Sequence, residues 1–181
     1  MRSKQGKYYL EYARNTYRTP EERAALAQYN NQELILNKGE MSAYRDPSKR
    51  EIIIAHRGTN QKRDLSADLA LGLGVEKYHP RFKRERKQTK AIRKANPGYS
   101  ITHTGHSLGG ALAERSSSKN DKVMTYQKAA GPTALVKKRR RNQTDFIHGY
   151  DPVSMMSHTQ RGGKQIRTMK FTLNPHSSYN L

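Results

Sequence analysis

The chain contains no cysteine, which excludes disulfide bonds and thiolate metal sites. It is also poor in the usual core residues, because Leu, Ile, Val and Phe make up only 28 of its 181 residues. Such scarcity, combined with a net charge of +20, is typical of disordered chains. The apolar residues are nevertheless grouped in strand-like runs beside glycines. This grouping and the chain length predict one folded domain over residues 1–181.

Long apolar runs are absent as well. No stretch approaches the 18 or so consecutive apolar residues of a transmembrane helix, and the N-terminal MRSKQGKYYLEYARN lacks the apolar centre of a signal peptide. We therefore expect a soluble protein without a classical export signal. The pI near 10.3 indicates polyanionic partners, of which anionic lipid head groups and nucleic acid are the two main classes.

Strand-like and helical patterns alternate along the chain. A capping box at Thr19–Glu22 predicts a helix to about Tyr29, and a second, very basic helix is expected over Pro80–Lys94, with Phe82, Ala91 and Ile92 as its apolar face. Strands are expected over residues 33–37, 41–45, 51–56, 99–104, 123–128, 145–150 and 164–173. Residues 52–55 are apolar on both faces, as in a covered central strand. The pattern predicts an α/β fold with a mostly parallel sheet flanked by helices.

The segment Ile101–Ala113 contains the motif G-x-S-x-G between a strand-like and a helical pattern. In a nucleophile elbow of this kind, the serine sits on a strained turn, and glycines two residues to either side avoid collisions with neighbouring backbone. We therefore predict that Ser107 is a nucleophile at the positive end of the following helix, with Gly105 and Gly109 as the elbow glycines.

A serine nucleophile needs a base and an acid that orients the base, in the chain order Ser, Asp or Glu, His. The carboxylates after Ser107 are Glu114, Asp121, Asp145 and Asp151. Glu114 falls on the following helix, Asp121 in a polar loop, and Asp145 at the start of a strand. Asp151 directly follows a strand and precedes a proline, so it is the predicted acid.

The histidines after Asp151 are His158 and His176. His176 follows the last predicted strand, whereas His158 comes only seven residues after Asp151 with no strand between them, so His176 is the predicted base. The remaining histidines, at positions 56, 79, 103, 106 and 148, are interpreted as packing or surface residues, and His106 as a neighbour of the cleft. No pair of histidines has metal-ligand spacing with a carboxylate, and we expect neither a metal nor a cofactor.

Four motifs in order make the chain similar to the class 3, or fungal-type, lipases of the α/β-hydrolase superfamily. They are Ile53–Thr59 with Asp64-Leu65 and Asp68-Leu69, then Gly105–Ala113, then Tyr150-Asp151-Pro152-Val153, and finally His176-Ser177-Ser178-Tyr179. The resemblance implies that the backbone N–H groups of Thr59 and Leu108 form the oxyanion hole and that Asp68 supports the oxyanion loop. Leu65 and His56 depart from the residues usual in the family, and any lid is short, at about residues 69–75.

The basic residues are concentrated in two runs. Eight of the fourteen residues of Arg81–Lys94 are Lys or Arg, and Lys137–Arg141 are five in succession. Three interpretations remain open: a solvated surface, a surface that holds anionic lipid and so favours phospholipid as substrate, or a nucleic-acid contact as in a virus particle.

Together these features predict a serine ester hydrolase, a lipase or phospholipase, that acts on lipid esters through Ser107, Asp151 and His176. The alternative is a basic protein, associated with nucleic acid or a virus particle, that retains a lipase fold. The sequence leaves the oligomeric state open.

Overall fold

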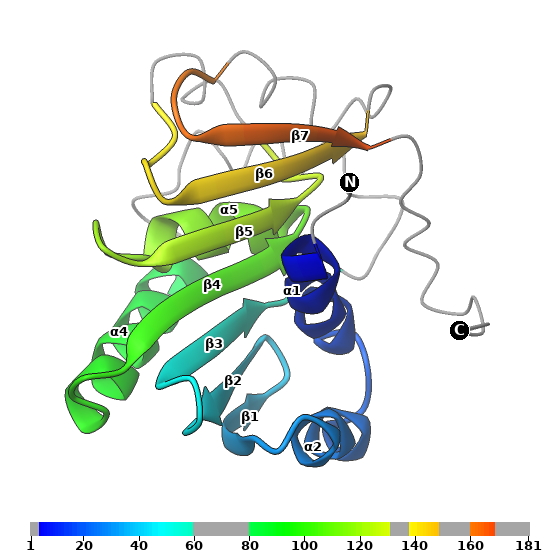
Figure 1. Ribbon diagram of the computed structural model, residues 1–181, viewed down its shortest axis with the longest axis vertical. Helices are drawn as coiled ribbons and strands as arrows, with labels where there is room; N and C mark the ends of the chain where they lie inside the picture. The colour runs from blue at the N-terminus through cyan, green and yellow to red at the C-terminus, as the bar shows by residue number, and fades with distance from the viewer. Residues whose placement is uncertain (1–3, 60–79, 131–137, 149–159, 169–181) are drawn as a thin grey trace.

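The computed structural model describes residues 4–59, 80–130, 138–148 and 160–168. Seven strands form one sheet in the order β1-β2-β3-β4-β5-β6-β7 (Figure 1). The strands are β1 Glu33–Lys38, β2 Met41–Asp46, β3 Glu51–His56, β4 Ser100–His106, β5 Lys122–Tyr126, β6 Gln143–His148 and β7 Lys164–Thr168. The helices are α1 Lys4–Asn15, α2 Pro20–Tyr29, α4 Pro80–Ala95 and α5 Leu108–Ser116.

The sheet is mixed, with β1, β2 and β3 antiparallel and β3 through β7 parallel. The carboxyl ends of the five parallel strands therefore lie along one edge, at the arrowheads in Figure 1. This confirms the predicted α/β class and the mostly parallel sheet with flanking helices. None of the described helices has the length and apolar character needed to cross a membrane.

Helices cover both faces of the sheet, with α1 on one face and α4 and α5 on the other (Figure 1). Alternate residues of β3 divide between the two sides. Ile53 and Ala55 pack into the core beneath α1, whereas Ile52 and Ile54 pack into a smaller cluster on the α4 side. All six residues of β3 are buried, as expected for a strand covered on both faces.

Helix α1 was not predicted from the sequence, although it supplies much of the larger core. Its tyrosines replace the missing aliphatic residues: Tyr9 and Tyr12 are buried and their hydroxyl groups donate to Glu51 and Gln32 at 2.7 and 2.8 Å. Because each hydroxyl has an internal partner, a tyrosine can fill core volume without leaving an unsatisfied polar group.

Helix α4 is attached to the sheet mainly through polar residues, which corrects the expected apolar face. Ala91 is exposed and Phe82 and Ile92 are half-buried, whereas Glu85 and Thr89 are the buried residues of the helix. Glu85 can lie inside because its carboxylate pairs with two cationic or polar partners, His56 Nδ1 at 2.6 Å and Arg81 Nε at 2.7 Å.

The same buried chain of polar groups continues between α4 and the sheet. His56 Nε2 lies 2.9 Å from His103 Nδ1, and His103 Nε2 lies 3.4 Å from Asp121 Oδ2, which Arg93 pairs at 2.6 Å. Burial lowers the pKa of His103 to about 4, and the charge of His56 acts in the same direction, although Asp121 opposes the shift. His103 is therefore neutral in the folded protein at neutral pH.

We predict that this neutral histidine makes stability pH-dependent. Below its usual pKa near 6.5, His103 takes up a proton in the unfolded chain but not in the folded one until about pH 4. The free energy of unfolding should therefore fall by up to about 3 kcal/mol as the pH drops from 6.5 to 4. Urea unfolding at several pH values between 6.5 and 4 measures the slope of the free energy of unfolding against pH.

His103→Gln is the matched variant, because glutamine keeps hydrogen-bonding groups at the site but does not titrate. The substitution also alters local packing, so the comparison is of slopes rather than of absolute stabilities. A slope as steep in His103→Gln as in the wild type would contradict the assignment.

Candidate active site

Ser107 occupies a sharp turn between strand β4, which ends at His106, and helix α5, which begins at Leu108. Its backbone has φ 54° and ψ −124°, a conformation that costs a non-glycine residue about 1–3 kcal/mol. The turn is held on both sides, because Ser107 N–H donates to Tyr126 O and Ala129 N–H donates to Ser107 O, each at 3.1 Å. The segment after β5 thus keeps the serine in its strained position.

The two glycines of the motif allow three backbone segments to approach closely. A Cβ atom at Gly105 would overlap the carbonyl group of Gly109 on α5, and one at Gly109 would overlap the carbonyl oxygen of His56 at the end of β3. Only glycine fits at either position without a shift of neighbouring backbone. The G-x-S-x-G spacing therefore allows the backbones of the turn, α5 and β3 to pack closely against one another.

The Ser107 side chain is only 3% exposed, and its hydroxyl has no hydrogen-bond partner among the described residues. It lies at the N-terminus of α5, where the helix dipole is positive and the first N–H groups have no acceptor within the helix. Leu108 is the first residue of that helix. The turn thus places a hydroxyl group beside a backbone donor that suits a developing negative charge.

The segment that follows β3 runs directly beside this turn. A Cβ atom at Gly58 would lie 2.8 Å from His106 O, and Gly58 N–H donates to the Tyr17 hydroxyl at 3.0 Å. Thr59, the next residue, is half-buried. Tyr17 therefore links the loop between α1 and α2 to the segment that carries Thr59.

Tyr17 also connects that segment to the turn itself. Its hydroxyl lies 3.4 Å from His106 Nδ1, and His106 Nε2 lies 3.0 Å from Gln127 Oε1. Since the amide oxygen of Gln127 only accepts, the protonated nitrogen of a neutral His106 is Nε2, and Nδ1 accepts from Tyr17. Sequence reasoning missed Tyr17 and Gln127, because nothing in the motif indicates which distant polar side chains will meet it.

Three of the four carboxylates after Ser107 have structural partners. Asp121 pairs with Arg93, and both Glu114 and Asp145 pair with the buried Lys128, at 2.6 and 3.0 Å. Desolvation would raise the pKa of the buried Asp145, but the charge of Lys128 and the surrounding hydrogen bonds lower it overall. The fourth, Asp151, lies outside the described residues, as do His158 and His176.

The described part of the basic run, residues 138–141, is only partly exposed to solvent. Arg139 is only 6% exposed, and its Nε pairs with Asp145 at 2.6 Å. Arg140 donates to the carbonyl oxygen of Ser117 at 2.7 Å, whereas Lys138 and Arg141 are exposed. The run therefore includes a buried structural arginine, because Asp145 needs a cation to offset its burial.

Two of the remaining histidines, His56 and His103, are packing residues, and His106 borders the turn. The side chains of His79 and His148 lie outside the described residues, as do Asp64, Leu65, Asp68 and residues 69–75. Within the described ranges, no cluster of three or more His, Asp or Glu side chains could hold a metal ion.

The sequence profile described as "Lipase (class 3)" matches residues 75–160, which include the strained turn and Asp151. The matched residues make up slightly less than half of the chain. The chain is thus similar to class 3 lipases over the segment that carries the candidate nucleophile. The segment with Thr59 and the segment with His176 lie outside the matched residues.

Solved structures show the same fold. The chain superposes on a triacylglycerol lipase described as having a serine protease triad with a TM-score of 0.66 and 19% identity, over 92% of this chain and 80% of that one. Lipase II from Rhizopus niveus superposes with a TM-score of 0.57 and 20% identity, over 94% of this chain and 83% of that one. The Rhizomucor miehei triacylglyceride lipase superposes with a TM-score of 0.61 and 16% identity, over 92% of this chain and 80% of that one. No curated protein sequence matches the chain.

The strain at Ser107 leads to a prediction about stability. Ser107→Gly should relieve the unfavourable φ, whereas Ser107→Ala should keep it. After allowing for the greater backbone entropy of glycine in the unfolded chain, we expect Ser107→Gly to be about 1 kcal/mol more stable than Ser107→Ala. Urea unfolding of the two variants makes the comparison; equal stabilities would show that the turn stores no strain.

Proposed function

We propose that this protein is a lipase-type serine hydrolase that cleaves carboxylic esters of lipids, with Ser107 as nucleophile, His176 as general base and Asp151 as the acid that orients it. The observation that carries the proposal is the state of Ser107: a strained serine at a helix N-terminus, with a buried hydroxyl that has no partner among the described residues. A strained residue of this kind is typical of a functional position.

Elimination supports Asp151 as the acid. Glu114, Asp121 and Asp145 are all held by cations, so none of them is free to orient a histidine near Ser107. Asp151 comes three residues after the end of β6, which is parallel to β4 and two strands away. Adjacent strands are about 4.8 Å apart, so the residues after β6 start roughly 10 Å from the turn, along the same edge.

A similar argument supports His176 as the base. His56 and His103 are buried in the polar chain beneath α4, and His106 bonds to Tyr17 and Gln127. His176 follows β7, three strands from β4, by eight residues. An extended chain of eight residues spans up to about 27 Å, which exceeds the roughly 14 Å between these strands.

The proposed reaction is acyl transfer. Ser107 Oγ attacks the carbonyl carbon while its proton passes to His176, and the N–H groups of Thr59 and Leu108 stabilise the oxyanion, each by about 3 kcal/mol. The alcohol leaves with the proton from His176, which gives the acyl-enzyme. Water then gives a proton to His176, attacks the same carbon and releases the acid and the free serine.

Covalent labelling and hydrolysis together test this proposal. A fluorophosphonate probe should modify the wild type at Ser107, and the wild type should hydrolyse p-nitrophenyl esters. Ser107→Ala should abolish labelling and reduce kcat by about 10⁴-fold or more. Ser100→Ala is the matched control, because Ser100 is an exposed serine at the opposite end of the same strand.

Further arms of the same experiment address the rest of the triad and the substrate. Asp151→Ala and His176→Ala should reduce kcat strongly, whereas Asp145→Asn should affect stability rather than the chemical step. Triglyceride emulsions and phospholipid vesicles separate a lipase from a phospholipase. Labelling and hydrolysis that persist in Ser107→Ala would refute the assignment of the nucleophile.

Tyr17 provides a second test, because it acts on the reaction only through Gly58 and His106. Tyr17→Phe keeps the ring but removes the acceptor of Gly58 N–H, so Thr59 should be held less firmly. We expect kcat to fall by about tenfold with little change in KM, since the oxyanion forms only after the substrate binds. Tyr8→Phe, which alters a tyrosine of the same region away from the turn, is the control; an unchanged kcat in Tyr17→Phe would exclude this positioning role.

A further inference from the structure

The outer surface of α4 carries cations that have no role inside the molecule. Arg81, Arg84 and Arg93 pair with Glu85, Glu40 and Asp121. The other exposed cations of the helix form no ion pair with a described carboxylate, and we call them the cationic stripe: Lys83, Arg86, Lys87, Lys90 and Lys94. At 3.6 residues per turn, they fall within an arc of about 100° and extend over roughly 16 Å.

Nothing acidic on the helix offsets this stripe. Glu85, the one carboxylate of α4, is buried against His56 and Arg81 and so faces away from the stripe. Among the described residues, Glu40 and Asp121 also contact the helix, and both are already paired with its arginines. Within the described part of the chain, the stripe is therefore a surface of one charge sign.

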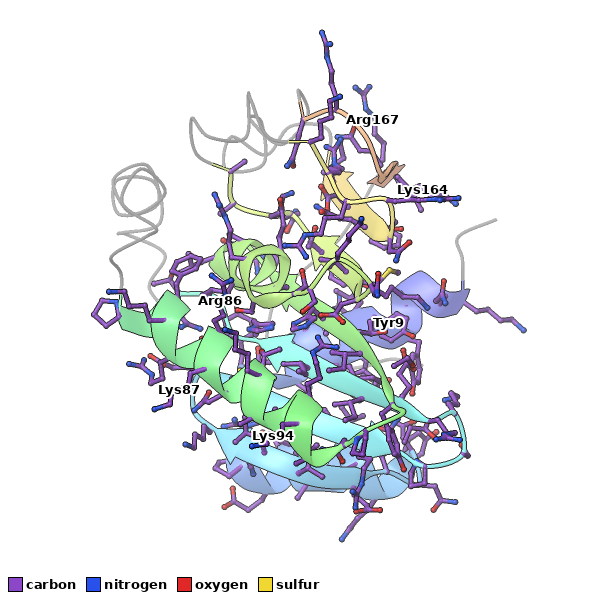
Figure 2. All side chains as sticks on the ribbon, turned by 90° about the vertical axis from the view of Figure 1, so that its left-hand side faces the viewer. Tyr9, Arg86, Lys87, Lys94, Lys164 and Arg167 are labelled. Atoms are coloured by element: carbon purple, nitrogen blue, oxygen red, sulfur yellow. The ribbon has the colours of Figure 1, made fainter. Side chains whose placement is uncertain are left out.

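Further exposed cations continue this surface beyond the end of the helix. Arg93 joins α4 to the loop at Asp121, and Arg140 joins that loop to the segment before β6. Lys119, Arg141 and Lys164 are exposed in or beside these segments. Figure 2 shows Arg86, Lys87 and Lys94 along α4, and Lys164 and Arg167 on β7, from the side where the parallel strands begin.

The cationic stripe and the candidate active site face different sides of the molecule. Arg81 donates to the carbonyl oxygen of Arg57, just after β3, whereas Asn96 at the other end of α4 accepts from Arg45 beside the start of β3. The helix therefore runs antiparallel to β3, and the stripe runs along the strands. A membrane against the stripe would lie roughly parallel to the sheet, and so at right angles to the surface formed by the carboxyl ends of the strands, where Ser107 lies.

We propose that the cationic stripe binds the phosphate backbone of double-stranded nucleic acid, independently of catalysis. The stripe carries five cations over roughly 16 Å, a length over which one strand of a duplex carries about five phosphates. The stripe contains no aromatic residue to stack on bases, so the interaction is with the backbone and independent of sequence. A lipid bilayer fits less well, because lipid held on the stripe would not be presented to Ser107.

The test uses the full chain and short fluorescent DNA duplexes of two unrelated sequences. The triple variant Lys87→Gln, Lys90→Gln, Lys94→Gln removes three stripe cations, and the control Lys4→Gln, Lys7→Gln, Lys38→Gln removes three exposed lysines from α1 and β1. Both variants have the same net charge, and glutamine is tolerated in a helix about as well as lysine. Thermal unfolding monitored by circular dichroism checks that each variant is folded.

Fluorescence anisotropy between 50 and 200 mM salt gives the slope of log K against log salt. Each phosphate that the protein neutralises contributes about 0.9 to the magnitude of this slope. We expect the wild type to bind both duplexes alike, and the stripe variant to have a slope smaller by about 2–3. Lys90→Gln alone should lower the slope by about 1, and the control and Ser107→Ala should keep the wild-type slope.

Three results would overturn the proposal. One is the absence of duplex binding by the wild type at 50 mM salt. Another is an equal decrease of slope in the stripe and control variants, which would indicate diffuse attraction by net charge. The third is binding to phosphatidylserine vesicles that depends on the stripe while duplex binding does not, which would assign the surface to a membrane.

Discussion

Every buried polar group in this protein needs a partner, and the chain buries many of them because it has few aliphatic residues. Glu51, Glu85, Asp121 and Asp145 all lie inside, each bonded to a tyrosine, histidine, lysine or arginine. A single unpaired charge at such a depth would cost several kcal/mol. The fold therefore depends on correct pairing as much as on apolar packing, which explains how a composition typical of disordered chains forms a domain.

The pairing also determines which ionisable groups remain for chemistry. Glu114, Asp121 and Asp145, which follow the nucleophile, form ion pairs that join neighbouring elements of the fold. His56 and His103, which precede it, belong to the polar contacts between α4 and the sheet. The hydroxyl of Ser107 is exceptional, since it is buried, strained and without a partner among the described residues. The hydroxyls of Ser42, Thr89 and Ser116 also lack a hydrogen-bond partner within the described ranges, but none of these residues has the strained backbone of Ser107. The combination of strain and an unpaired hydroxyl at a helix N-terminus is what marks Ser107 as the position of a reaction.

Local patterns predicted the parts of the structure that depend on neighbours in sequence. The capping box at Thr19, the covered strand at residues 51–56 and the glycine spacing around Ser107 each follow from short-range sterics or hydrogen bonding. Sequence reasoning failed where long-range polar pairing decides the outcome. It assigned Ala91 to the buried face of α4, because it did not anticipate that His56 and Arg81 would draw Glu85 inward. It also missed Tyr17, whose partners lie 41 and 89 positions away.

The same pairing explains why the charge of +20 is distributed unevenly over the molecule. With 35 Lys and Arg against 15 Asp and Glu, the carboxylates are too few to neutralise the cations, and many of them are used up inside. On α4, Arg81, Arg84 and Arg93 pair with Glu85, Glu40 and Asp121, so the cationic stripe forms no ion pair with a described carboxylate. The helix thus has two electrostatic roles on opposite sides. Its inner side closes a buried network that stabilises the sheet beneath Ser107, and its outer side is left as a positive surface whose orientation is set by that network.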